Sequence, residues 1–103
     1  RQAVNGLSVD DKLLDYLLAL VEKTHHHPDL LVGASPRATL RWLQAAKADA
    51  WLNGQDYLLP DNLKTVALPL LRHRLILRPE AQLDGVDIAG IIAAIVDQTA
   101  VPR

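Results

Sequence analysis

Hydrophobic residues recur along this chain at the three- and four-residue spacing of amphipathic helices. The pattern runs from Ser8 to about His26, from Ser35 to Asn53, from Pro60 onward and again from Asp87. The apolar stripes consist of Val9, Leu13, Leu17 and Leu20, then Leu43, Ala46 and Ala50, then Leu63, Val66, Ala67 and Leu70, and last Ile88, Ile91, Ile92 and Ile95. Segments of this kind, joined by short loops, predict an all-α fold class: a compact bundle of about four or five helices.

The first two helices carry recognisable end signals. Ser8 is placed to cap the free N–H groups of the first helix, and Pro28 stops that helix because the residue before a proline disfavours helix. Ser35 is a good N-cap for the second helix, and Pro36 suits its first position, where the missing N–H costs nothing. Gly54 supplies the C-terminal stop.

The remaining chain is less regular. Trp42 and Trp51 are expected beside the inner face of the second helix. Pro69 interrupts the third helix and predicts a kink or a break there. Residues 75–77 favour a single extended stretch packed against the helices, and residues 79–86 form the longest expected loop.

Composition narrows the class of protein. The chain has 103 residues, half of them apolar and 22% charged, which indicates one globular domain. Its net charge of −1 lacks the basic surplus of a general nucleic-acid binder. The absence of cysteine excludes disulfides and thiolate metal sites. No apolar run reaches the roughly 20 residues that span a bilayer, and the N-terminus does not resemble a signal peptide. We therefore expect a cytoplasmic location, without nucleic-acid or membrane partners.

The signatures of an independent catalyst are missing. The glycines are scattered, so neither a Walker A phosphate loop nor a dinucleotide fingerprint is present. No Ser/His/Asp arrangement is evident. Because the chain begins at Arg1 rather than at a methionine, we expect it to be a piece of a larger protein.

Three consecutive histidines, His25, His26 and His27, end the first helix. A metal site on a helix needs its ligands three or four residues apart on one face, whereas successive residues point about 100° apart. We therefore expect a solvent-exposed helix end and no metal site. Partly protonated imidazoles are favourable at that end of the helix dipole.

The strongest candidate for an anion-binding residue is Arg37, in the run Gly33-Ala34-Ser35-Pro36-Arg37-Ala38. Arg37 occupies the second position of a helix, where the dipole favours negative charge. Two interpretations stay open on physical grounds: an exposed arginine tolerated at small cost, or an arginine that faces an anion together with the helix N-terminus. Arg41 lies one turn further and shares the face of Arg37.

The segment from Pro28 to Ala38 resembles the sensor 2 region of MoxR-type AAA+ ATPases. Further similarity covers nearly the whole chain in order. It includes Ser8-Val9-Asp10-Asp11 with Leu14-Asp15-Tyr16, Asp56-Tyr57, Pro60-Asp61-Asn62-Leu63, Leu71-Arg72-His73-Arg74-Leu75 and Val101-Pro102-Arg103. Leu59 departs from the pattern, because the family often has a Ser or Thr cap there, and the triple histidine replaces a mix of charged residues.

The resemblance implies a division of labour between domains. Residues 1–103 would be a single helical lid domain, with residues 1–7 a linker from a missing N-terminal nucleotide-binding core. Arg37 would be the sensor 2 arginine that reaches the γ-phosphate of ATP, with Pro36 and Arg41 beside it. ATP and Mg²⁺ would be held mainly by the core, so the isolated chain is expected to be no enzyme and to bind no cofactor.

The same resemblance implies partners and a role for the intact protein. It would be an ATPase that couples ATP hydrolysis to chaperone-like remodelling of other proteins. It would assemble as a homo-oligomeric ring, generally a hexamer, and would work with proteins that carry von Willebrand factor A domains.

A free-standing helical interaction module is the alternative. In its DNA-binding form, Arg37, Arg41 and Lys47 would lie on the recognition helix of a helix-turn-helix motif. The net charge of −1 and the nearby Asp49 argue against it. A GxxxxGK[ST] loop in roughly two hundred residues upstream of Arg1 would decide for the lid.

Overall fold

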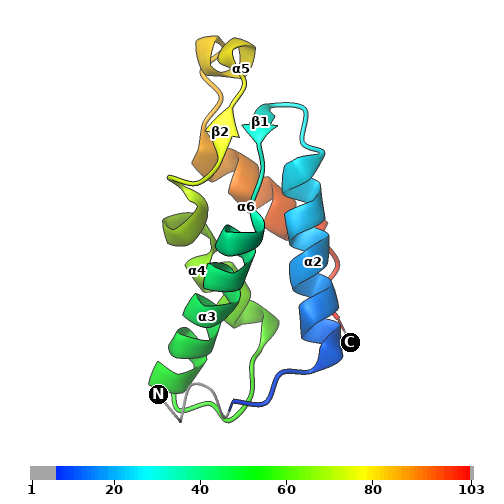
Figure 1. Ribbon diagram of the computed structural model, residues 1–103, viewed down its shortest axis with the longest axis vertical. Helices are drawn as coiled ribbons and strands as arrows, with labels where there is room; N and C mark the ends of the chain where they lie inside the picture. Colours follow the sequence, from blue (N-terminus) through cyan, green and yellow to red (C-terminus); the bar gives the residue numbers. More distant parts are fainter. Residues whose placement is uncertain (1–6, 103) are drawn as a thin grey trace.

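The computed structural model of the chain describes residues 7–102 (Figure 1). Its elements are α2 (Asp11–His25), β1 (Leu30–Val32), α3 (Pro36–Leu52), α4 (Pro60–Leu71), β2 (Ile76–Leu77), α5 (Pro79–Leu83) and α6 (Ile88–Gln98). Helices dominate this part of the chain, which confirms the all-α class. Residues 1–6 of the expected linker lie outside the described residues, and Leu7 is buried in the core.

A small antiparallel sheet joins β1 to β2. Leu30 pairs with Leu77 and Val32 with Ile76, with an irregular register between the two pairs. The prediction of an extended stretch within residues 75–77 is confirmed at Ile76–Leu77, but the expectation that it would be single is wrong, because it pairs with β1. Figure 1 shows the two strands side by side at one end of the molecule, with α5 beyond them. The short helix α5 occupies part of the expected loop 79–86.

The start of α2 differs from the expectation. Asp10, not Ser8, is the N-cap, and its carboxylate accepts a hydrogen bond from the Lys12 N–H at 3.0 Å. Ser8 is extended and bridges to Tyr57, since its carbonyl accepts the Leu58 N–H at 2.9 Å. Both residue types cap helices well; the tertiary bridge holds Ser8 outside the helix. The predicted end is confirmed, because α2 stops at His25.

Helix α3 begins and ends where the sequence signals place it. Ser35 is the N-cap, Pro36 is the first helical residue, and Gly54 follows the end of the helix with a φ of 72°. Its buried residues are Ala38, Trp42, Ala46 and Ala50, at steps of one turn. Trp42 thus lies in the core rather than beside it, and its indole N–H donates to the Leu63 carbonyl at 2.9 Å. Trp51 is 48% exposed.

Helix α4 does not break at Pro69, contrary to one of the two expected outcomes; it continues to Leu71. A proline removes one helical hydrogen bond, here the bond to the Thr65 carbonyl, and only Leu70 and Leu71 follow Pro69 in the helix. At the other end, Leu59 supplies no side-chain cap, but the Asn62 side chain accepts the Leu59 N–H at 2.8 Å.

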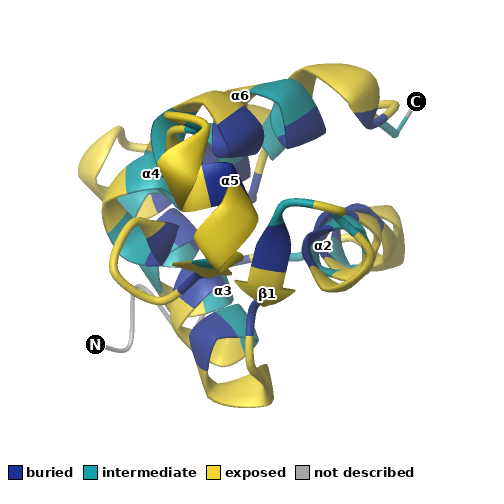
Figure 2. Cartoon of the chain, turned by 90° about the horizontal axis from the view of Figure 1, so that it is seen from above, coloured by how far each residue is buried: buried dark blue, intermediate teal, exposed yellow. Residues whose placement is uncertain are grey.

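The core lies where α2, α3, α4 and α6 meet (Figure 2). The predicted isoleucine stripe is confirmed, because Ile91, Ile92 and Ile95 of α6 are buried and Ile88 packs at the edge of the core. Among the described residues no helix combines the length and apolar character needed to cross a membrane.

Candidate functional site

The start of α3 carries the three residues that the sequence singles out. Pro36, Arg37 and Arg41 are all exposed. Arg37 and Arg41 stand one turn apart on the same helix, a spacing at which like charges repel slightly. Neither guanidinium has a hydrogen bond or an ion pair with another residue of the described range 7–102. The site therefore presents two cations with unused donors.

The backbone at this helix start is mostly satisfied internally. The Ala38 N–H donates to the Ser35 hydroxyl at 3.0 Å, and the Thr39 N–H donates to the Ser35 carbonyl at 2.9 Å. Pro36 has no N–H to offer. An anion here would therefore be held mainly by guanidinium, whose forked donors match phosphate oxygens, with help from the positive end of the helix dipole.

A groove lies beside this helix start, between α2 and α3. Its volume is about 370 Å³. It is lined by Leu18, Val21, His25, Ala34, Pro36 and Thr39. The lining is largely apolar, so the groove offers a surface for another apolar group next to the arginines.

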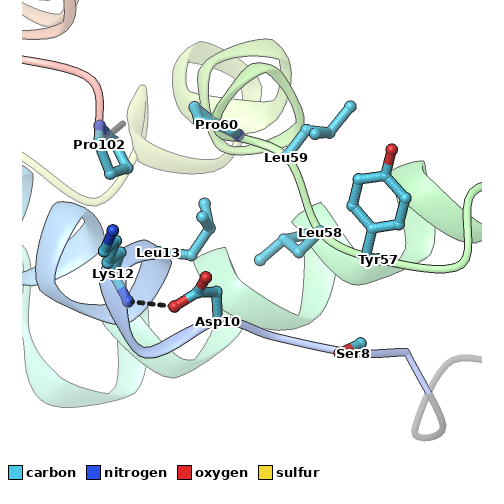
Figure 3. A pocket seen from close by; sticks show the side chains of 9 residues that line it. All are labelled: Ser8, Asp10, Lys12, Leu13, Tyr57, Leu58, Leu59, Pro60 and Pro102. Atoms are coloured by element: carbon cyan, nitrogen blue, oxygen red, sulfur yellow. Dashed lines mark hydrogen bonds between the residues drawn. The ribbon is translucent and has the colours of Figure 1, made fainter.

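A second hollow of about 360 Å³ lies at the opposite end of α2, where the chain enters (Figure 3). Its lining includes Leu13, Leu59 and Pro60, which are apolar. Its carboxylate, Asp10, already accepts the Lys12 N–H. Its other polar residues are Ser8, Lys12 and Tyr57, and Figure 3 shows the side chains of Ser8 and Tyr57 apart from that of Asp10, so we assign no chemical site to this hollow.

The three histidines diverge. His25 Nε2 lies 2.7 Å from the Ala34 carbonyl, and His26 Nε2 lies 2.8 Å from a carboxylate oxygen of Glu22. The His27 Nδ1 accepts the Asp29 N–H at 3.1 Å. Across residues 7–102, no three histidine, cysteine or acidic side chains gather in a group that could hold a metal ion.

Sequence reasoning missed the residues that hold the arginine-bearing run in place. Thr24 is 2% exposed, and its hydroxyl accepts the Ala34 N–H at 2.9 Å. Together with the contact from His25, both backbone polar groups of Ala34 are engaged by the last turn of α2. The spacing of Thr24, His25 and Ala34 in the sequence does not predict this contact, because a turn and the strand β1 lie between α2 and Ala34.

Comparison with known proteins shows what the chain is similar to. Residues 22–95 match the family model of the AAA lid domain. An uncharacterised protein, YeaC of Bacillus subtilis, is 34% identical over 102 residues, which are 99% of this chain and 32% of that protein. The chaperone MoxR1 of Mycobacterium tuberculosis is 32% identical over 104 residues, which cover 92% of this chain and 28% of that protein.

A solved structure agrees with these relatives. The crystal structure of a "putative ATPase" from Cytophaga hutchinsonii matches with a TM-score of 0.91 and 32% identity, over 99% of this chain and 34% of that one. The chain thus spans about a third of the length of the proteins it matches. With the lid family matched over most of the chain and MoxR proteins among its relatives, the chain belongs to the AAA lid domains, as a lid of the MoxR type.

Proposed function

We propose that this lid supplies the sensor 2 arginine, Arg37, to the γ-phosphate of ATP bound by the nucleotide-binding core of the same polypeptide. The observation that carries the proposal is the state of Arg37 itself. It is exposed, it lies at the second position of a well-capped helix, and it has no partner among the described residues. A cation at this position is disfavoured by the dipole unless an anion faces it.

The physical role of Arg37 follows from its chemistry. A guanidinium binds phosphate oxygens through parallel charge-assisted hydrogen bonds. Where charge builds up on the transferring phosphoryl group, such a cation stabilises the transition state. Arg41 stands one turn away and would add positive potential, and Pro36 is the first residue of the helix that would face the nucleotide.

The described residues fit a lid that contacts ATP and leaves the metal to the core. They offer exposed cations for phosphate, and within residues 7–102 no three histidine, cysteine or acidic side chains form a group that could hold a metal ion. Mg²⁺ is usually held by carboxylates together with substrate phosphates. On this proposal the isolated chain is no enzyme, and the intact ATPase carries the metal and most phosphate contacts on its core.

The same proposal extends to the intact protein. Because Arg37 touches the nucleotide only when lid and core are close, ATP hydrolysis would change the orientation of the lid. We infer that the protein is a cytoplasmic homo-oligomeric ring, generally a hexamer. It would use these movements for chaperone-like remodelling of partners that include proteins with von Willebrand factor A domains. A relative of this chain is named a chaperone.

The test is ATP turnover by the intact ATPase with Arg37→Ala. We expect kcat to fall by about a hundredfold, the usual effect of removing one donor to a developing charge. The matched control is Arg78→Ala, an exposed arginine at the start of α5 whose side chain makes no cap hydrogen bond. Unchanged turnover in Arg37→Ala, with a folded lid, would remove Arg37 from the mechanism.

A second measurement tests whether most phosphate contacts belong to the core and not to the lid. The isolated chain should not bind ATP at micromolar concentration in a calorimetric titration, because most phosphate contacts would belong to the core. Micromolar affinity would contradict the proposal and would indicate a complete nucleotide site within the chain.

A further inference from the structure

The residue that leads into the arginine-bearing helix is held on both sides by the end of another helix. Ala34 is 1% exposed. Its N–H donates to the Thr24 hydroxyl at 2.9 Å, and its carbonyl lies 2.7 Å from the His25 Nε2. Because a carbonyl only accepts, the His25 Nε2 must carry the proton, which it does as imidazolium and as one neutral tautomer.

The Thr24 hydroxyl both donates and accepts a hydrogen bond in this arrangement. While it accepts the Ala34 N–H, it donates to the Val21 carbonyl at 2.7 Å. The bond to Val21 fixes the hydroxyl relative to the backbone of α2. The bond from Ala34 then fixes the Ala34 N–H relative to the same helix. A buried hydroxyl with both roles filled has one preferred orientation.

Gly33 lets the two segments approach this closely. A Cβ atom at Gly33 would lie 2.8 Å from both the carbonyl carbon and the carbonyl oxygen of Thr24. Both are backbone atoms of a helix, which cannot move aside as the end of a flexible side chain could. The glycine is required by close backbone approach, and the approach places Ala34 within hydrogen-bonding reach of α2.

The held residue stands three positions before Arg37. Between them, Ser35 caps α3 through its hydroxyl and Pro36 has a restricted φ. Because Ser35 and Pro36 have little conformational freedom, a displacement of Ala34 should also displace the first turn of α3. The backbone that enters the first turn of α3 is therefore anchored to the end of α2.

We propose that Thr24 and His25 are positioning residues for Arg37. Their polar contacts with Ala34 fix the first turn of α3, and hence the direction of the guanidinium. This inference rests on the proposed role of Arg37 at the nucleotide. Displacement of a binding group by about 1 Å is enough to lower a rate by orders of magnitude. Loss of the contacts between Ala34 and the end of α2 should thus lower ATP turnover even while the lid stays folded.

The experiment is a double-mutant cycle in the intact ATPase with Thr24→Val and Arg37→Ala, read as kcat and KM for ATP. Thr24→Val keeps the shape of the side chain and removes the hydroxyl. We expect it to lower kcat about tenfold when Arg37 is present and less than about twofold when Arg37 is already alanine. Thr24→Ser, which keeps the hydroxyl, should restore most of the turnover.

A matched control separates positioning from loss of stability. Thr99 is also buried, and its hydroxyl donates to the Ile95 carbonyl at 2.6 Å, on α6. Thr99→Val removes a comparable hydrogen bond away from Ala34 and should change kcat by less than about twofold. His25→Gln should retain turnover, because its amide nitrogen is the same number of bonds from Cα as Nε2, whereas His25→Ala should lower it.

The outcomes distinguish this inference from the proposal on which it rests. If Arg37→Ala leaves turnover unchanged, the proposed function fails, and the positioning role fails with it. If Arg37→Ala lowers turnover but Thr24→Val lowers kcat equally in both backgrounds, or no more than Thr99→Val does, only the positioning role is refuted.

Discussion

The side-chain amide of Asn62 joins three segments of the fold, and its replacement by aspartate should destabilise the lid strongly. Asn62 is 3% exposed. Its oxygen accepts from the Leu59 N–H at 2.8 Å and from the Gln55 amide at 2.9 Å. Its nitrogen donates to an Asp49 carboxylate oxygen at 2.8 Å and to the Gln55 amide oxygen at 3.2 Å. Every polar capacity of the amide is used.

The change Asn62→Asp keeps the shape and the two accepted hydrogen bonds. It removes both donated hydrogen bonds, to Asp49 and to Gln55, and brings two carboxylates into contact at Asp49. Loss of a hydrogen bond to a charged group costs about 1.5–3 kcal/mol. Repulsion between unit charges at this separation reaches roughly 6 kcal/mol at an effective dielectric constant of 20, a ceiling that proton uptake or movement apart reduces. We expect the free energy of unfolding to fall by about 3–4 kcal/mol at neutral pH.

The assay is urea unfolding of the chain at pH 7 and at pH 4. The folded variant holds two carboxylates in contact and binds a proton more readily than its unfolded state, so acid should reduce the penalty. Asn53→Asp is the matched control, because Asn53 is exposed at the end of α3; its cost should stay below about 1 kcal/mol. Equal stability of Asn62→Asp and the natural chain at pH 7, or a penalty that does not shrink in acid relative to the control, would refute the reasoning.

Three further changes test the structure by thermal unfolding. Gly33→Ala should destabilise by about 1–3 kcal/mol, because its Cβ would lie 2.8 Å from the backbone of Thr24; an unchanged Tm would contradict the close approach. Ser35→Ala should cost about 1 kcal/mol through loss of the cap on α3, and a melt identical to that of the natural chain would rule out that cap. Tyr16→Phe should stabilise by about 1 kcal/mol, because the buried Tyr16 hydroxyl has no hydrogen-bond partner among residues 7–102; destabilisation would show that the hydroxyl is satisfied. Burial, with a smaller contribution from the Asp61 carboxylate, raises the pKa of Tyr16 above 10.0, so the unfolded state loses its proton first. The natural chain should therefore lose stability as the pH rises above 10.0, and Tyr16→Phe should lose less.

The position of Arg37 illustrates how far sequence reasoning reaches toward a site. Its place at the second position of a capped helix follows from Ser35 and Pro36, and the structure confirms that placement. Its exposure and its lack of a partner among the described residues are tertiary facts. The grip of Thr24 and His25 on Ala34 was beyond prediction, since hydrogen bonds between separate segments leave no periodic trace in the sequence.

Local chemistry by itself determined where several helices begin and end. The start of α3 at Pro36, the turn at Gly54 and the end of α2 before Pro28 depend on caps and backbone restrictions that act within a few residues. The stripe of isoleucines in α6 likewise follows from helical periodicity, because burial of one face is decided by spacing. These features are the same in any context that keeps the helices.

Only the tertiary structure decided the rest. Ser8 and Asp10 are both good caps, and the bridge from Ser8 to Tyr57 left the role to Asp10. The stretch at Ile76–Leu77 became a strand because β1, far away in sequence, meets it. Such choices depend on which distant segment supplies a hydrogen-bond partner or a close backbone contact. That information resides in the packing of the whole chain and not in the pattern of any single segment.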